Sequence, residues 1–190
     1  MDLSLQQFYH WFGLNRALFR WLADIHFPAW DWATVFLNTI SDPVHFPWYV
    51  GGALLTAYVA PRLVAPGSAM TFAIGFAPLL LAAAHLRTAI GLPRAVDLAE
   101  IGVRAATVLK TSDGVPSAAA AFVFLFAASL APGAPAPARI SLWLLAVLAA
   151  TARVAAGTAF PADVAGGAVL AILFAWVLRT FLRLIGPAGA

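Results

Sequence analysis

Long apolar stretches, separated by short connections that contain proline or charged residues, run through most of the chain. A helix needs about 20 mostly apolar residues to cross the hydrocarbon core of a bilayer. Five stretches meet this requirement to within a few residues: 46–65, 68–88, 115–132, 139–157 and 161–184. A sixth stretch, 28–41, is short and carries Asp31 and Asn38, so the sequence leaves open whether it spans completely. The pattern predicts an all-α integral membrane protein that forms a six-helix bundle.

The first residues follow a different pattern, that of an amphipathic helix. Polar residues recur every three or four positions in a segment otherwise rich in Leu, Phe and Trp: Gln6, His10, Gly13, Arg16, Arg20 and Asp24. Such a stripe is typical of a helix that lies in the membrane interface or begins a first span. The segment has no basic region followed by an apolar core, so no signal peptide is expected. We expect one membrane domain over residues 1–190, with an amphipathic N-terminal segment at 1–26 and the bundle at 27–185.

Two pairs of glycines lie inside the apolar stretches. Gly51 with Gly52, and Gly166 with Gly167, have no side chains that would hold a neighbouring helix away. We expect both pairs to serve close helix packing.

The composition agrees with a membrane protein. Hydrophobic residues make up 63% of the chain, charged residues make up 10%, and the mean hydropathy is +0.89, whereas soluble domains contain about 25% charged residues. The chain has no cysteine, which excludes disulfides, thiolate metal sites and cysteine nucleophiles. The net charge of +3 comes almost wholly from arginine, without a basic run. We therefore expect anionic lipid and phosphate groups as partners and no nucleic acid; the oligomeric state is left open.

Arginine bias predicts the orientation of the bundle. Arg179 and Arg183 close the last span, which favours a cytoplasmic C-terminus. Counting back places two connections on the cytoplasmic side, 61–67 and 133–138, and two outside, 89–114 and 158–160. The outer side nevertheless holds several basic residues: Arg87, Arg94, Arg104, Lys110 and Arg153. Charged residues at membrane depth are functional candidates by default.

Residues that suit an anion are predicted to meet on this outer side. Arg87 and Arg94 flank the end of the third span, Ser117 opens the fourth, Arg153 closes the fifth and Asp163 opens the sixth. Arginine presents a planar fork that matches two phosphate oxygens. Ser117 lies at the first turn of a helix, where free N–H groups and the helix dipole favour a negative ligand. The alternative interpretation is that the arginines only snorkel to the headgroups and that Ser117 is an ordinary helix cap.

Three short segments hold these residues at characteristic spacings: "RTAIGLPRA" at 87–95, "PSAA" at 116–119 and "ARVAAGTAFPAD" at 152–163. They resemble the motifs K-x6-R-P, P-S-G-H and S-R-x5-H-x3-D of the type 2 phosphatidic acid phosphatase family of membrane lipid phosphatases. Several positions depart from the family pattern and are occupied by alanine: Ala95, Ala118, Ala119, Ala152 and Ala159. Ala119 and Ala159 stand where the family has its two histidines. The resemblance covers roughly residues 15–185.

The resemblance implies a reaction and a role for each matched residue. In the family, the histidine at the position of Ala159 attacks phosphorus, the aspartate at Asp163 orients it, and the histidine at Ala119 protonates the leaving alcohol. The remaining positions hold phosphate oxygens: Arg87, Arg94, Ser117, Ala118 and Arg153. No metal or cofactor takes part. The implied substrate is a lipid phosphate or pyrophosphate, of the phosphatidate or undecaprenyl pyrophosphate type, bound at the extracytoplasmic side of a bacterial cytoplasmic membrane.

Alanine can neither attack phosphorus nor donate a proton, so the chain as written is expected to be inactive. The remaining histidines are not expected to substitute: His85 and Arg87 face different ways on a helix, and nothing in the sequence aims His10, His26 or His45 at the site. Three interpretations follow. The chain is a phosphatase whose two histidines were replaced, a natural protein that binds or carries a lipid phosphate, or an unrelated membrane subunit whose arginines only anchor it.

Overall fold

The structure, a computed structural model, describes residues 13–91 and 114–185. This described part consists of helices and turns without any strand, which confirms the predicted all-α class. The helices are α2 (Leu14–Ala23), α3 (Pro28–Ile40), α4 (Phe46–Val59), α5 (Pro66–Ile90), α6 (Ala118–Leu130), α7 (Ala136–Ala155) and α8 (Pro161–Ile185). Two 3-10 helices, η2 (Pro43–His45) and η5 (Ala131–Gly133), precede α4 and α7. α2 falls within the predicted amphipathic segment, and α3 to α8 follow the six predicted apolar stretches.

Among the described residues, three helices are long and apolar enough to cross a membrane: Pro66–Ile90, Ala136–Ala155 and Pro161–Leu184. The membrane character predicted from the sequence is therefore supported. α3 and α6 have 13 residues each and α4 has 14, or about 20 Å at 1.5 Å per residue. This is shorter than the hydrocarbon core of about 30 Å. The count of six spans stays a prediction.

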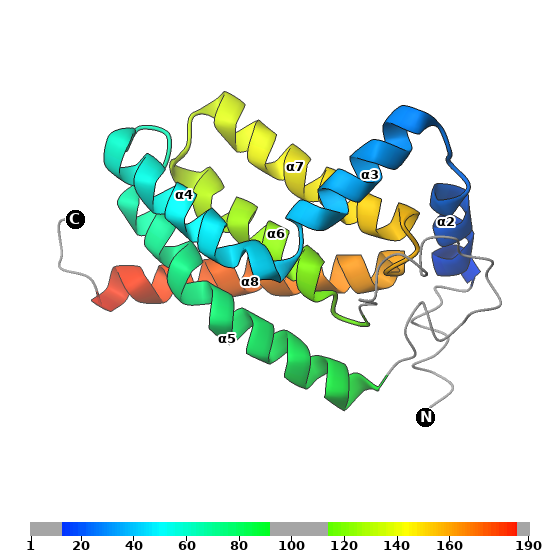
Figure 1. Cartoon of the computed structure of the whole chain (residues 1–190). Helices are drawn as coiled ribbons and strands as arrows, with labels where there is room; N and C mark the ends of the chain where they lie inside the picture. The colour runs from blue at the N-terminus through cyan, green and yellow to red at the C-terminus, as the bar shows by residue number, and fades with distance from the viewer. Residues whose placement is uncertain (1–12, 92–113, 186–190) are drawn as a thin grey trace.

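The helices run back and forth along one direction, so their ends gather at two places (Figure 1). The C-termini of α5 and α7 and the N-termini of α6 and α8 lie toward the end where α2 is found. α3 packs along α7 near this end. α4 continues from there along α5 toward the opposite end. The described helix ends that flank the predicted outer connections, 89–114 and 158–160, therefore lie toward one end of the bundle.

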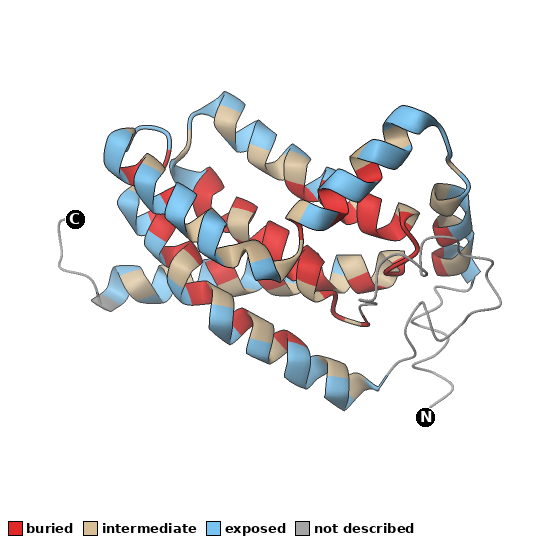
Figure 2. Ribbon diagram, viewed as in Figure 1, coloured by how far each residue is buried: buried red, intermediate tan, exposed pale blue. Residues whose placement is uncertain are grey.

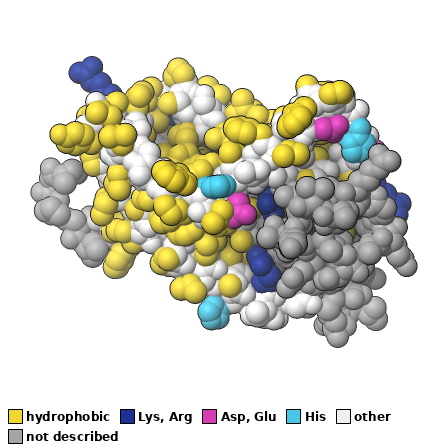
Figure 3. Space-filling view, viewed as in Figure 1, with side chains coloured by type: hydrophobic (Ala, Val, Ile, Leu, Met, Phe, Trp, Pro, Cys, Tyr) yellow, Lys and Arg dark blue, Asp and Glu magenta, His cyan; other side chains and the backbone are white. Residues whose placement is uncertain are grey.

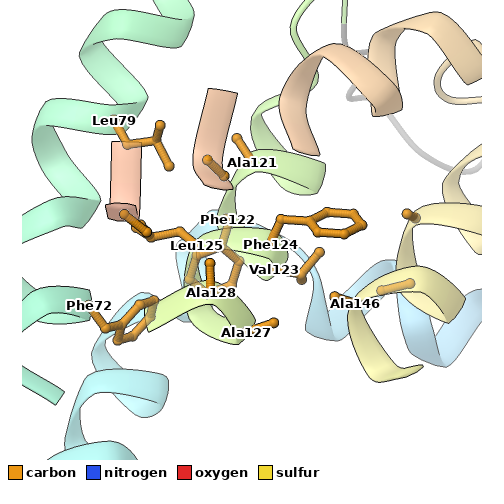
Figure 4. Packing of buried hydrophobic residues seen from close by; sticks show 14 residues of the cluster. Phe72, Leu79, Ala121, Phe122, Val123, Phe124, Leu125, Ala127, Ala128 and Ala146 are labelled. Atoms are coloured by element: carbon orange, nitrogen blue, oxygen red, sulfur yellow. The ribbon is translucent and has the colours of Figure 1, made fainter. Parts of the chain in front are cut away.

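α6 forms the centre of the bundle. Eleven of its 13 residues are buried, because α5, α7 and α8 all pack against it (Figure 2). A helix that is apolar all round belongs in such a position. On one side, Phe72 and Phe122 contact each other at 6.1 Å between ring centres. On the side of α7, the Phe124 ring packs near Trp143 and small alanines such as Ala146 (Figure 4).

The two glycine pairs have different environments. A Cβ atom on Gly167 would lie 2.5 Å from the Ser117 carbonyl oxygen, so only glycine allows α8 to approach the first turn of α6 this closely. Gly166 also faces this turn, at ordinary contact distance. The expectation of close packing is confirmed for this pair. It is wrong for Gly51 and Gly52, because nothing described lies within 4 Å of a Cβ atom built on either; both glycines are exposed.

Candidate functional site

A tight turn joins α7 to α8 and fixes the position of Arg153. Gly157 adopts a left-handed conformation with φ of +71°, which glycine tolerates without strain. The Gly157 N–H donates to the Val154 carbonyl at 2.9 Å, and the Thr158 N–H donates to the Arg153 carbonyl at 3.1 Å. The Thr158 hydroxyl donates to the same Arg153 carbonyl at 2.9 Å. This is a Schellman C-cap, and it holds Arg153 in the last turn of α7 with 4% of its surface exposed.

The start of α8 is held by two side-chain acceptors. The carboxylate of Asp163, which is fully buried, accepts a hydrogen bond from the Phe160 N–H at 2.8 Å. The side-chain oxygen of Asn15, on α2, accepts one from the Ala162 N–H at 3.0 Å. The first N–H groups of a helix have no partner within the helix, so both bonds are caps. Phe19 of α2 packs on Phe160, with 4.8 Å between ring centres. Asp163 thus shapes the turn that contains Ala159.

The start of α6 is bonded to both neighbours. Ser117 is the N-cap residue, and its hydroxyl accepts a hydrogen bond from the Ala120 N–H at 3.2 Å. The Ser117 N–H donates to the Asp163 carbonyl oxygen of α8 at 2.9 Å. The Arg87 guanidinium, from the last turn of α5, donates to the Pro116 carbonyl oxygen at 3.1 Å. Ser117 therefore caps α6, and the same residue connects α8 to the segment that Arg87 contacts; its predicted role in phosphate binding stays a prediction.

These contacts define a polar cluster, made of Arg87, Ser117, Arg153, Thr158 and Asp163. Four of its members are predicted site residues from four different helix ends; Thr158 was not predicted. Ser117, Arg153, Thr158 and Asp163 are buried, and Arg87 is half-buried. Arg94, another predicted phosphate ligand, lies outside the described residues, as does Ala95 of the same motif.

Three of the alanines at motif positions, namely Ala118, Ala119 and Ala159, lie in the segments that meet at the cluster, and a fourth, Ala152, is buried beside Arg153 in α7. Ala118 and Ala119 form the first turn of α6, directly after Ser117, and Ala159 lies in the turn before α8. Ala159 is fully buried and Ala119 is 2% exposed, whereas Ala118 is half-buried. Because both methyl groups at the histidine positions are enclosed, an imidazole at either position would have to displace its neighbours.

The cluster favours an anion electrostatically. Helices α6 and α8 begin there, and a helix N-terminus carries partial positive charge. Arg87 and Arg153 add two formal positive charges against the single negative charge of Asp163. In Figure 3, hydrophobic side chains cover most of the end that carries α4, and most charged and histidine side chains lie toward the α2 end. Within the described part of the chain, these charges and helix ends suit an anion better than a cation.

The described histidines have other positions. The His85 ring contacts the Leu81 carbonyl oxygen of its own helix at 2.8 Å and is exposed. The ring of His26 lies 3.4 Å from the Asp31 carboxylate, also at an exposed position. His45 belongs to η2, between α3 and α4. His10 lies outside the described residues.

Sequence reasoning missed two contacts. Asn15 lies beside the predicted polar stripe of α2 rather than in it. The one signal of its role as a cap is that it is a polar residue outside that stripe. Arg179, interpreted only as an orientation marker, donates from one guanidinium nitrogen to the Ala128 and Ser129 carbonyl oxygens, at 2.7 and 2.9 Å. It therefore satisfies carbonyls at the C-terminal end of α6.

Comparison of the chain with protein-family models, with curated proteins and with solved structures finds no match.

Proposed function

We propose that this protein is a multi-pass membrane protein that binds the phosphate group of a lipid at the polar cluster. In this proposal, α3 to α8 form a six-helix membrane bundle, and the cluster faces the extracytoplasmic side of a bacterial cytoplasmic membrane. The chain would be related to the type 2 phosphatidic acid phosphatases. It would be inactive because alanine occupies both histidine positions, Ala119 and Ala159.

The burial of Arg153 carries the proposal. This arginine is 4% exposed and lies in the last turn of a helix that is long and apolar enough to cross a membrane. An arginine that only anchored the protein would extend to the headgroups and remain exposed. A buried charge at this depth is costly and is retained for a function. Its burial therefore weakens the anchoring interpretation for Arg153.

The chemistry of the cluster supports phosphate as the ligand. Guanidinium groups bind phosphate oxygens with charge-assisted hydrogen bonds, which are about twice as strong as neutral ones. Arg87 and Arg153 reach the cluster from two different helices, α5 and α7. The N-termini of α6 and α8 add their dipoles from two further directions. A neutral lipid headgroup would use none of these features.

A binding protein without catalysis is favoured by the capping roles of two motif residues. Survival of Ser117 and Asp163 beside two missing histidines looks at first like an enzyme from which only the reactive groups were removed. However, Ser117 caps α6 and Asp163 caps the start of α8. Both residues therefore stabilise the fold even if no reaction takes place, so their presence fits a natural lipid-phosphate binder or carrier.

The test compares two variants of one helix. Arg153→Gln removes the buried charge, and Arg139→Gln removes an exposed charge from the first turn of α7, at the opposite end. A hydrogen bond to a charged group contributes about 1.5–3 kcal/mol. We therefore expect the Kd for phosphatidic acid to rise about tenfold or more in Arg153→Gln and to stay unchanged in Arg139→Gln. Diacylglycerol, which lacks the phosphate, should bind weakly to all three proteins.

Equal affinity of the parent chain and both variants for phosphatidic acid would refute the proposal. If Arg153→Gln does not fold, Arg87→Gln replaces it, because Arg87 is only half-buried. Helical circular dichroism and a monodisperse elution profile establish that each variant is folded before binding is measured.

A further inference from the structure

A groove of about 560 Å³ lies between α4 and α7, in a different part of the molecule from the polar cluster. Its lining includes Trp48 and Gly52 from α4, Phe126 from α6, and Leu142 and Leu145 from α7. A volume of this size is typical of a ligand site in proteins.

The lining has the chemistry of a hydrocarbon surface. No charged side chain lines the groove. The Thr56 hydroxyl donates to the Gly52 carbonyl oxygen of its own helix at 2.7 Å, and the Tyr49 hydroxyl donates to the Ile40 carbonyl oxygen at 3.0 Å. These two hydroxyl protons are therefore already used within the protein, and the third hydroxyl of the lining, on Ser141, lies at an exposed position of α7. The groove therefore favours an apolar ligand, which makes van der Waals contacts with the lining.

The position of the groove points to the interior of a bilayer. Leu63 and Val64, in the turn before α5, and Ala138, near the start of α7, line one end of it. Ala138 lies about 20 Å along α7 from Arg153, at 1.5 Å per residue. The groove thus occupies the half of the bundle opposite the cluster.

The surface beside the groove is apolar as well. Leu55 on α4 is 62% exposed and Leu144 on α7 is 55% exposed. α7 is one of the helices long and apolar enough to cross a membrane. The groove is therefore continuous with an exposed apolar surface of the kind that contacts lipid chains.

We propose that this groove binds a hydrocarbon chain of a membrane lipid from the leaflet opposite the polar cluster. From Ala138 to Leu145 it follows about 10 Å of α7, which fits within one leaflet of a hydrocarbon core about 30 Å thick. The hydrocarbon chain of the lipid lies between α4 and α7 and fills the space that these two helices leave over α6. This site does not depend on phosphate binding at the cluster, and either one can exist without the other.

Two neighbouring glycines provide a matched pair of variants. Nothing described lies within 4 Å of a Cβ atom on Gly51 or Gly52. Of the two, Gly52 lines the groove and Gly51 does not. Gly52→Leu should therefore fill the groove without a backbone clash, and Gly51→Leu should add the same side chain outside it.

The experiment uses phosphatidylcholine with a diazirine in its acyl chain, in nanodiscs, followed by mass spectrometry of the labelled peptides. We expect labelling of α4 and α7 peptides in the parent chain and in Gly51→Leu, and a severalfold loss in Gly52→Leu. Phosphatidic acid binding at the cluster should be the same in all three. If Gly52→Leu does not fold, Thr56→Phe replaces it, because Thr56 also lines the groove. This variant must then show the same severalfold loss of labelling.

Equal labelling of these peptides in the parent chain and Gly52→Leu would overturn the proposal. A dimer in solution that Gly52→Leu dissociates, while Gly51→Leu does not, would also overturn it, because the groove would then hold a second copy of the chain.

Discussion

Gly167 on α8 faces the first turn of α6 at a distance that leaves no room for a methyl group. In Gly167→Ala the new Cβ atom would lie 2.5 Å from the Ser117 carbonyl oxygen and 3.0 Å from the Ala121 nitrogen. Both are backbone atoms of a buried helix and cannot rotate away. The two helices must therefore separate, and the bond from the Ser117 N–H to the Asp163 carbonyl, 2.9 Å long, must stretch.

The expected magnitude combines effects of opposite sign. Alanine is better than glycine inside a helix by about 0.8–1 kcal/mol. Overpacking of a well-packed core costs about 1–3 kcal/mol, and loss of the inter-helix hydrogen bond costs about 1 kcal/mol more. We expect Gly167→Ala to lower the free energy of unfolding by about 1–3 kcal/mol. It should also weaken binding of phosphatidic acid, because Ser117 and Asp163 belong to the polar cluster.

Gly166 is the natural control, since it is adjacent in the same helix. A Cβ atom there would meet Val115 at 3.4 Å and Pro116 at 3.7 Å, which are ordinary contacts. Gly166→Ala should therefore be neutral or more stable by up to about 1 kcal/mol, through helix propensity alone. Equilibrium unfolding in detergent, followed by tryptophan fluorescence, measures both variants. If Gly167→Ala is as stable as Gly166→Ala, the close approach of α6 and α8 is wrong.

Three further predictions concern the cap at the start of α8 and the two histidine positions. Asn15→Ala should lower the free energy of unfolding by about 0.5–2 kcal/mol, the usual cost of a lost cap. Asn15→Asp keeps an acceptor for the Ala162 N–H and should therefore lose less stability. Equal losses of stability in the same unfolding assay would contradict the capping role. The chain as written should release no phosphate from a lipid pyrophosphate or from p-nitrophenyl phosphate, because loss of a nucleophile in another covalent hydrolase costs about a millionfold in kcat. A chain with both Ala119→His and Ala159→His should release phosphate if it folds, although each buried imidazole costs about 1–3 kcal/mol in overpacking; a folded but inert double variant would count against phosphatase ancestry.

The sequence by itself determined the helical class, the positions of the helices and the end of the molecule at which Arg87, Ser117, Arg153 and Asp163 lie. Apolar runs of helix length and prolines at helix starts, as at Pro66 and Pro161, are local signals. Alternation of direction between consecutive helices then brings Arg87 and Arg153 to one end, whatever the packing between them. The cap at Ser117 was also predictable, because a serine before a helix bonds within its own turn.

The tertiary structure decided which helix faces touch, and local patterns do not contain that information. Gly51–Gly52 and Gly166–Gly167 are the same dipeptide, yet one pair faces open space and the other faces the backbone of α6. Asn15 accepts a capping hydrogen bond from Ala162, which lies 147 residues later in the chain, and Arg179 caps the end of α6 from α8. Such contacts depend on the rotation and crossing of each helix, which are set by how side chains from distant segments fit together. Hydrophobic periodicity indicates that a helix face is apolar, but only the fit of two surfaces selects its partner.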